Sequence, residues 1–168
     1  MGKNIVLIGF MGTGKSSVGQ RLAEKLKMKF IDMDREIEKI TGLPINQIFR
    51  KHGEIRFRSE EKLLAQKLGH ESNLVIATGG GVVLSQENIE ALRENGILIC
   101  LEASPEEILK RVKRKKASRP LLKKEFGEKE IKAMLEARDA FYACTDFRIN
   151  TNNKEPRAIV EEITRCLR

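Results

Sequence analysis

Short apolar runs alternate along this chain with segments in which apolar residues recur every three or four positions. A short apolar run is typical of a buried strand, and the longer repeat is typical of an amphipathic helix. The runs predict five strands, at 4–8, 29–31, 73–78, 97–101 and 146–150. Strands that alternate with helices favour an α/β fold built on a mostly parallel sheet.

Several of the predicted helices have clear start and stop signals. Ser104-Pro105-Glu106-Glu107 combines a capping serine, a proline at the first helical position and a glutamate that completes a capping box. Asp34 is expected to cap a helix that carries Ile37 and Ile40 on its apolar face, and Gly96 is expected to end another helix. Further helices are expected within 18–26, 44–49, 53–68, 85–92, 128–142 and 156–167.

The segment Gly9-Phe10-Met11-Gly12-Thr13-Gly14-Lys15-Ser16 fits the phosphate-loop pattern G-x-x-x-x-G-K-[ST] and lies between the first strand and a helix. Its glycines let successive backbone N–H groups point inward at an anion, and the helix adds its positive end. Lys15 would reach the β- and γ-phosphates of a nucleotide, and the Ser16 hydroxyl would hold Mg²⁺.

Length, cysteine content and hydropathy indicate one domain in a reducing compartment. A chain of 168 residues is large enough for one core, and no apolar run approaches the roughly 20 residues that span a membrane. Its three widely spaced cysteines are best explained as reduced thiols of a cytoplasmic protein, and we expect no signal peptide.

The net charge of +8 comes from one segment, because residues 110–124 hold nine Lys or Arg and no acid, whereas the rest of the chain has a net charge of −1. This segment could be a nucleic-acid patch, a solvated helix face or a mobile basic flap over an anionic ligand. Beside a phosphate loop we favour the flap, and the small number of aromatic residues weakens a base-stacking function.

Other candidate residues follow the predicted strands. Asp32 and Asp34 lie two apart at a strand end, where an extended backbone would point both carboxylates the same way. One could support Mg²⁺ through a water and the other could accept a proton from a substrate hydroxyl. Gly79-Gly80-Gly81 suggests a close backbone approach to a ligand, although alone it could be a flexible turn.

These residues together resemble the shikimate kinase family over essentially the whole chain. The phosphate loop alone identifies only a superfamily, but the ordered set of motifs is specific. The matching motifs are Gly9–Ser16, Asp32-Met33-Asp34, Phe57-Arg58-Ser59-Glu60-Glu61, Gly79-Gly80-Gly81, Arg119-Pro120-Leu121-Leu122, and Arg138 followed by Tyr142.

The resemblance implies transfer of the γ-phosphate of ATP to the 3-hydroxyl of shikimate, in aromatic amino-acid synthesis. ATP is the implied co-substrate and Mg²⁺ the implied cofactor, held by Ser16 and, through water, by Asp32. Asp34 would bind the substrate hydroxyls and act as the base, and Arg119 would reach the transferring phosphate from a lid. Lys15, Asp34 and Arg119 are therefore the implied catalytic residues.

The implied binding residues form two sets. ATP would contact Gly12, Thr13, Gly14, Lys15, Ser16, Ser17, Arg111 and Arg119, with Arg111 stacking on adenine. Shikimate would contact Asp34, Arg58, Glu61, Gly79, Gly80, Gly81 and Arg138.

The resemblance also implies the architecture of a three-layer P-loop kinase, with a five-stranded parallel sheet flanked by helices. A substrate-binding region is expected at about 33–61 and a mobile lid at about 112–126, within the single domain 1–168. We expect a monomer that binds small molecules and neither nucleic acid nor membrane.

Three alternative functions are compatible with parts of the sequence. Gluconate and nucleoside monophosphate kinases share the phosphate loop and the general architecture. A GTPase is disfavoured because Pro156 stands where the Asn153-Lys154 pair would need a following aspartate to bind guanine. A nucleic-acid-binding module would show salt-sensitive binding to DNA or RNA.

Overall fold

The computed structural model describes residues 2–114 and 127–168, and in these residues five strands form one sheet in which every neighbouring pair runs parallel. The spatial order is β2-β3-β1-β4-β5. The strands are β1 (Asn4–Ile8), β2 (Lys29–Asp32), β3 (Leu74–Ala77), β4 (Gly96–Glu102) and β5 (Phe147–Asn150).

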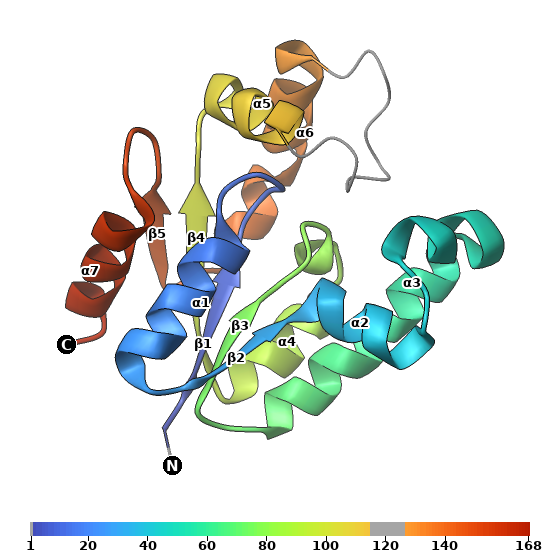
Figure 1. Cartoon of the computed structure of the whole chain (residues 1–168), viewed down its shortest axis with the longest axis horizontal. Helices are drawn as coiled ribbons and strands as arrows, with labels where there is room; N and C mark the ends of the chain where they lie inside the picture. Colours follow the sequence, from blue (N-terminus) through green and yellow to red (C-terminus); the bar gives the residue numbers. More distant parts are fainter. Residues whose placement is uncertain (1, 115–126) are drawn as a thin grey trace.

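Helices connect the strands, as parallel pairing requires (Figure 1). They are α1 (Lys15–Leu26), α2 (Met33–Thr41), α3 (Ile45–His70), α4 (Gln86–Glu94), α5 (Pro105–Arg114), α6 (Glu128–Tyr142) and α7 (Pro156–Cys166), with a 3₁₀ turn η1 (Val82–Leu84). Within the described ranges, none of these helices is long and apolar enough to cross a membrane.

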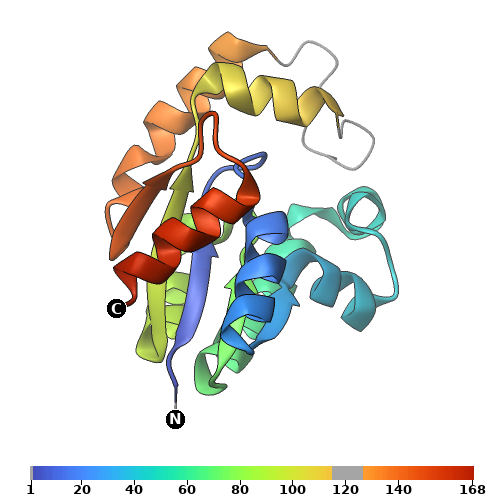
Figure 2. The same cartoon turned by 60° about the vertical axis from the view of Figure 1, so that its left-hand side comes forward.

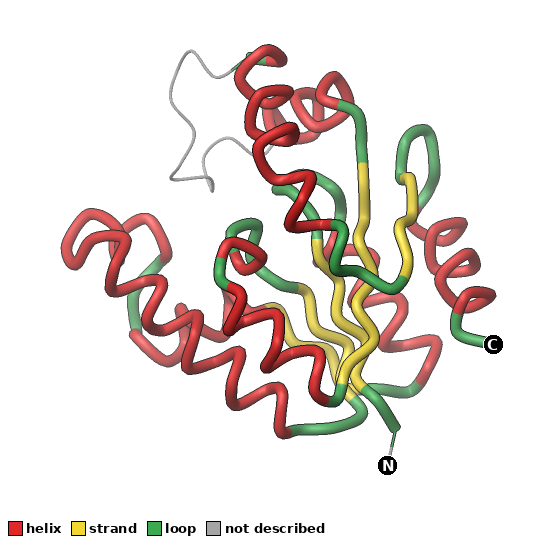
Figure 3. Tube along the Cα trace, turned by 180° about the vertical axis from the view of Figure 1, so that it is seen from behind, coloured by secondary structure: helices red, strands yellow, loops and turns green. Residues whose placement is uncertain are grey.

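The sheet is the middle of three layers. Helices α1 and α7 cover one face (Figure 2), and α3 and α4 cover the other, seen from behind in Figure 3. The central strand β1 supplies both cores, since Ile5 and Leu7 pack with α1 and α7 whereas Val6 and Ile8 pack with α3 and α4. This alternation is the period-two pattern of a strand that is buried on both faces.

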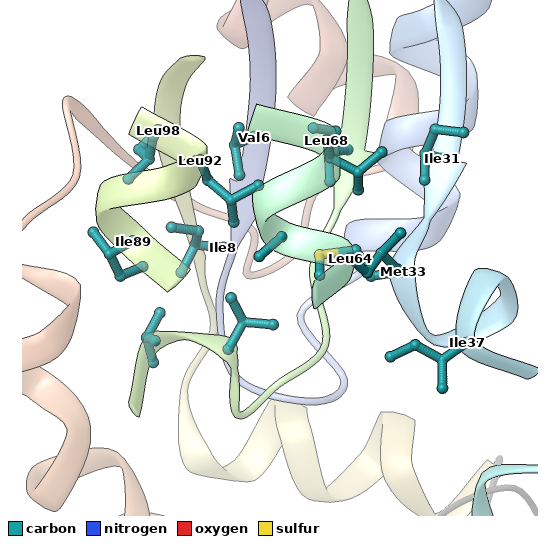
Figure 4. Packing of buried hydrophobic residues seen from close by; sticks show 14 of the residues in the cluster. Val6, Ile8, Ile31, Met33, Ile37, Leu64, Leu68, Ile89, Leu92 and Leu98 are labelled. Carbon is teal, nitrogen blue, oxygen red and sulfur yellow. The ribbon is translucent and has the colours of Figure 1, made fainter. Parts of the chain in front are cut away.

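The core beneath α3 and α4 is a continuous set of aliphatic side chains. Leu64 and Leu68 of α3 and Leu92 of α4 lie against the sheet (Figure 4), and each is at most 2% exposed. Complete burial of a leucine stabilises a fold by roughly 1.5–3 kcal/mol. This packing gives the carboxyl ends of the strands a rigid support.

A third and smaller apolar cluster lies above the carboxyl ends of the strands. Phe10 and Met11 of the loop after β1 pack there against Ile108 and Val112 of α5 and Ile131 of α6. Because α5 and α6 pack directly on this loop, the two helices lie at the same end of the sheet as the residues that follow β1, β2 and β3 (Figure 1).

The expectation that Asp34 caps α2 is wrong, because Asp32 occupies the cap and its Oδ1 accepts a hydrogen bond from the Arg35 N–H at 3.3 Å. Asp34 lies in the first turn of the helix. Ile40 was also misplaced on the apolar face, since it is 54% exposed while Ile37 is fully buried. The helix is short and lies at the margin of the sheet, so its buried stripe is narrow.

Gly53, with φ 80° and ψ 172°, breaks α3 into two helical segments, as expected from the sequence. Two other details differ from the sequence-based expectation. Helix α4 ends at Glu94 with Asn95 as its C-cap, and Gly96 begins β4 instead of ending the helix. A Cβ on Gly96 would overlap the Leu92 carbonyl oxygen, so glycine is needed for this close approach. At α5 the Ser104 hydroxyl caps the Glu107 N–H at 3.3 Å, but the Ser104 N–H donates to Asn152 Oδ1 instead of completing a capping box.

Candidate active site

The loop at residues 9–16 joins β1 to the N-terminus of α1. Gly12 and Gly14 have φ values of 79° and 93°, in the left-handed region that glycine adopts without strain. This backbone turns the chain through a tight arc and brings the N-terminus of α1 to the carboxyl end of the sheet. The phosphate loop therefore has the strand, turn and helix that anion binding requires.

The Lys15 side chain folds back over this loop. Its Nζ donates hydrogen bonds to the carbonyl oxygens of Gly9 at 2.6 Å and Phe10 at 2.9 Å, and the residue is only 8% exposed. The Thr13 hydroxyl also donates to the Phe10 carbonyl, at 2.8 Å. The ammonium group is thus held at the positive end of α1, where both would attract a phosphate chain.

Ser16 and Asp32, the two predicted magnesium-binding residues, lie side by side. The Ser16 hydroxyl donates a hydrogen bond to Asp32 Oδ2 at 2.6 Å. No three His, Cys, Asp or Glu side chains gather as a metal site in the part of the chain that the structure describes. A hydroxyl and a single carboxylate nevertheless suit Mg²⁺, because this ion keeps several waters and binds through few protein oxygens and substrate phosphates.

The Asp32 and Asp34 carboxylates do not point the same way by strand alternation, as the sequence had suggested, because α2 begins between them. The first helical turn instead brings Asp34 to the triple-glycine turn after β3. A Cβ on Gly79 would lie 2.7 Å from Asp34 Oδ1 and 3.2 Å from Glu61 Oε2. Glycine at position 79 therefore leaves room for two carboxylates.

Arg58 of α3 reaches the same turn. Its Nη1 donates to Glu61 Oε1 at 2.9 Å, and its Nη2 lies 3.4 Å from Glu54 Oε1. A Cβ on Gly81 would overlap both terminal nitrogens of Arg58, so the guanidinium packs directly against the Gly81 backbone. It also lies 5.3 Å from the centre of the Phe57 ring.

Glu61 is a nearly inaccessible carboxylate, with 1% exposure. Burial raises its pKa above the usual 4.5, and the nearby Asp34 and Glu54 add to the increase, while Arg58 opposes it. Its Oε2 has no hydrogen-bond partner among the described residues. Glu61 thus binds Arg58 through Oε1, whereas its Oε2 lies near Gly79, on the same side of the turn as Asp34.

Arg138 of α6 approaches the turn from the opposite side. Its Nη1 donates to the Gly80 carbonyl at 3.1 Å, and its guanidinium lies 5.2 Å from the centre of the Phe10 ring. The structure therefore brings Arg58 and Arg138, which are 80 positions apart in the numbering, to adjacent glycines of one turn. Two guanidinium groups at one turn suit the recognition of a small carboxylate.

Arg111 lies at the nucleotide end of the site. It donates from Nε to Glu107 Oε1 at 3.1 Å and from Nη1 to the Gly12 carbonyl at 3.2 Å. Its Nη1 and Nη2 also donate to the hydroxyl and carbonyl oxygens of Thr151, at 3.0 and 3.1 Å. These bonds use the edge of the guanidinium, so a ring that stacks on Arg111 would do so on a face of the group.

Arg119 and the greater part of the predicted lid, from residue 115 onward, lie outside the described residues. Two contributors within the described residues were missed by sequence reasoning: Phe10 beneath Arg138 and Thr151 behind Arg111. Phe10 lies inside the phosphate loop, but the loop pattern assigns no role to that position. Thr151 carries no sequence signal beyond its position after the last strand. Asn152, which bonds the start of α5, begins a loop that resembles the adenine-side loop of the family, but the resemblance assigned it no role.

A parallel sheet with a phosphate loop after β1, faced by an aspartate and two arginines, defines a P-loop kinase that acts on a small acceptor. The family model described as shikimate kinase matches residues 11–168. The chain therefore belongs to the shikimate kinase family, whose members are ATP-dependent kinases.

Individual relatives agree with this membership. A shikimate kinase of Pelotomaculum thermopropionicum is 53% identical over 166 residues, which cover 99% of this chain and 96% of the relative. A shikimate kinase of Caldanaerobacter subterraneus is 48% identical, covering 98% and 95%. A solved shikimate kinase from Acinetobacter baumannii, in complex with shikimate, is 39% identical with a TM-score of 0.94, covering 99% of this chain and 93% of that one.

Proposed function

We propose that this protein is a shikimate kinase, which transfers the γ-phosphate of ATP to the 3-hydroxyl of shikimate and yields shikimate 3-phosphate and ADP in aromatic amino-acid synthesis. The observation that carries the proposal is the convergence of Arg58, Arg138 and Asp34 on the triple-glycine turn. This arrangement offers a carboxylate clamp and a base on one small acceptor, within reach of the phosphate loop.

In the proposed complex, the loop N–H groups and Lys15 bind the phosphates of ATP, and Lys15 exchanges its bonds to the Gly9 and Phe10 carbonyls for phosphate oxygens. Ser16 and, through water, Asp32 hold Mg²⁺, which supplies charge neutralisation on the phosphates when bound. The remaining loop residues Gly12, Thr13, Gly14 and Ser17 contribute binding groups around the same phosphates.

At the acceptor, Arg58 and Arg138 bind the shikimate carboxylate, and the Gly80 backbone contributes to the same contact. The oxygen of the shikimate 3-hydroxyl bonds to the γ-phosphorus while the bond from that phosphorus to the ADP oxygen breaks. Asp34 accepts the proton that this hydroxyl loses. Glu61 holds Arg58 in place, and Gly79 and Gly81 leave room for the carboxylates and the guanidinium. Catalysis then depends on positioning and charge rather than on a covalent intermediate.

We assign 33–61 to substrate binding and about 112–126 to a lid from which Arg119 reaches the transferring phosphate, within one domain spanning 1–168. We also propose that the enzyme is a cytoplasmic monomer. The thiols of Cys100, Cys144 and Cys166 are all free, which suits a reducing compartment. The exposed large apolar side chains include Ile40, Ile55, Leu63, Leu84 and Phe141.

A coupled ADP-release assay tests the proposal. Purified protein with ATP and Mg²⁺ should release ADP in response to shikimate, and much less in response to gluconate or to nucleoside monophosphates. Chelation of Mg²⁺ should abolish the signal and added Mg²⁺ should restore it. ADP release that does not respond to shikimate, or that responds equally to gluconate, would contradict the proposed substrate.

A further inference from the structure

Thr151 follows β5 and is a completely buried polar residue, with 0% exposure. Its hydroxyl donates to the Glu102 carbonyl at 2.7 Å, and its N–H donates to the same carbonyl at 2.8 Å. The hydroxyl also accepts from Arg111 Nη1 at 3.0 Å, and the Thr151 carbonyl accepts from Arg111 Nη2 at 3.1 Å. One residue therefore ties the end of β4 to a guanidinium of α5.

Arg111 in turn spans three parts of the nucleotide side of the site. Its Nη1 reaches both Thr151 and the Gly12 carbonyl, and its Nε pairs with Glu107 one helical turn back on α5. Hydrogen bonds from a charged donor are stronger than those between neutral groups, and the planar fork fixes their relative directions. The guanidinium is thereby locked in its own plane.

The Gly12 carbonyl is a sensitive point of the phosphate loop. Gly12 has a left-handed backbone, with φ 79°. In an anion-binding loop the N–H groups point inward, so the carbonyl oxygens, which repel phosphate, must point away. A positive donor on the Gly12 carbonyl stabilises that outward orientation. Arg111 supplies this donor, and Thr151 supplies the acceptors that aim it.

We propose that Thr151 is a positioning residue for ATP, which acts through Arg111. By fixing the guanidinium plane, it preorganises the phosphate loop at Gly12 and holds one face of Arg111 ready for the adenine ring. The inference rests on the proposed function, because it assumes that ATP occupies the phosphate loop. The proposal adds that the protein groups that bind the adenine and those that bind the phosphates are linked through the buried hydroxyl of Thr151.

The test compares three substitutions by steady-state kinetics. Thr151→Val keeps the shape and removes the hydroxyl, so the KM for ATP should rise about tenfold, as the loss of one hydrogen bond to a charged group predicts, and the KM for shikimate should change less than about twofold. Thr151→Ser should restore the KM for ATP. Thr164→Val is a matched control, because among the described residues the Thr164 hydroxyl bonds only the Val160 carbonyl of α7, at 2.7 Å, and the substitution should leave both constants unchanged.

A double-mutant cycle separates positioning from general destabilisation. If Thr151 acts through Arg111, then Thr151→Val should have no further effect on the KM for ATP in an Arg111→Leu background. Thr151→Ala replaces Thr151→Val if the valine does not fold. If neither hydroxyl-free variant folds while Thr151→Ser is native, Thr151 is needed for folding and the proposal is overturned.

The outcomes distinguish this inference from the proposed function. A wild-type protein without shikimate-dependent ADP release would contradict the function itself. An active wild type whose Thr151→Val variant keeps the wild-type KM for ATP, or raises both substrate constants equally, would overturn only the positioning role. An effect of Thr151→Val that persists in full without Arg111 would do the same.

Discussion

At the triple-glycine turn, the missing side chain at position 81 leaves room for the guanidinium of Arg58. Gly81→Ala should push Arg58 aside, because the new Cβ would overlap both of its terminal nitrogens. The obstructed group is the end of a flexible side chain and Gly81 has an ordinary φ of −100°, so the free energy of unfolding should change by less than about 1 kcal/mol. The KM for shikimate should rise roughly tenfold, since small displacements of positioning groups are costly.

Gly69→Ala is the matched control for that substitution. Its Cβ would overlap the Ala91 carbonyl oxygen, which is backbone of α4 and cannot move aside. The free energy of unfolding should therefore fall by about 2 kcal/mol, while the KM for shikimate of the folded fraction stays unchanged. Urea unfolding and initial rates measure the two effects, and a reversed pattern would contradict the assignment of Gly81 to the Arg58 contact.

Glu61 predicts a pH dependence of stability. Because burial raises its pKa above 4.5, the folded protein binds this proton more tightly than the unfolded chain does. Its contribution to stability is therefore present at pH 4.5 and below, and it is lost as pH rises through the higher pKa of the folded state. Glu61→Gln removes the titration.

The free energies of unfolding of wild type and Glu61→Gln should be compared at pH 4.5 and at about pH 8. The wild type should lose stability relative to the variant at the higher pH. A difference that is independent of pH would show that Arg58 cancels the effect of burial, and a difference that changes in the opposite direction would show that Arg58 outweighs it. Either result would mean that the pKa of Glu61 is not raised.

Sequence reasoning found the chemical groups of the site better than it found their geometry. The phosphate loop could be placed because its glycines, lysine and serine are local in sequence. Asp34 was expected on an extended backbone, but it lies in the first turn of α2. The boundary between β2 and α2 depends on Asp32, which serves as the cap of the helix. Thr151 was missed because its partners, Glu102 and Arg111, are 49 and 40 positions away.

At the scale of elements, hydrophobic periodicity predicted the strands and most helices because each element buries a face against the sheet. The helix predicted at 128–142 matches α6, and Pro156 begins α7 as expected. Periodicity failed to predict which side chains are buried where a helix is short, as at the exposed Ile40 of the nine-residue α2. The break at Gly53 was expected from the glycine itself, but the direction in which the helix axis turns at this residue depends on tertiary packing.

The cap of α2 allows the structural and metal-binding roles of Asp32 to be separated. Asp32→Ala removes both the cap and the partner of Ser16, and it should lower the free energy of unfolding by about 1 kcal/mol. Asp32→Asn preserves capping but not the negative charge, and its stability should stay within about 0.5 kcal/mol of wild type. Both variants should need at least about tenfold more Mg²⁺ for half-maximal activity.

Urea unfolding and a Mg²⁺ titration of ADP release measure these two properties. If Asp32→Asn retains the wild-type requirement for Mg²⁺, then Asp32 is a cap only, and its hydrogen bond to Ser16 at 2.6 Å orders the loop without contributing to metal binding.

At the scale of the whole molecule, the proposed site is assembled from segments that only the complete fold brings together. The phosphate loop follows β1, Asp34 opens α2, Arg58 comes from α3, and Arg138 comes from α6. The sheet order places β1 between β3 and β4, so residues after β1 and β3 meet at one edge. Global unfolding must therefore destroy both binding sites at once.

Each substrate should consequently stabilise the whole chain. A ligand that binds only the folded state adds about 2.7 kcal/mol to the free energy of unfolding at a hundred times its Kd, so shikimate alone and ATP with Mg²⁺ should each raise the urea midpoint without changing the slope. Arg58→Ala, tested at the wild-type concentrations, should lose most of the shift from shikimate and keep that from ATP, because only the carboxylate clamp is altered. Calorimetric binding of shikimate without any shift in the midpoint would mean that its site survives unfolding, which a site divided among α2, α3 and α6 does not allow.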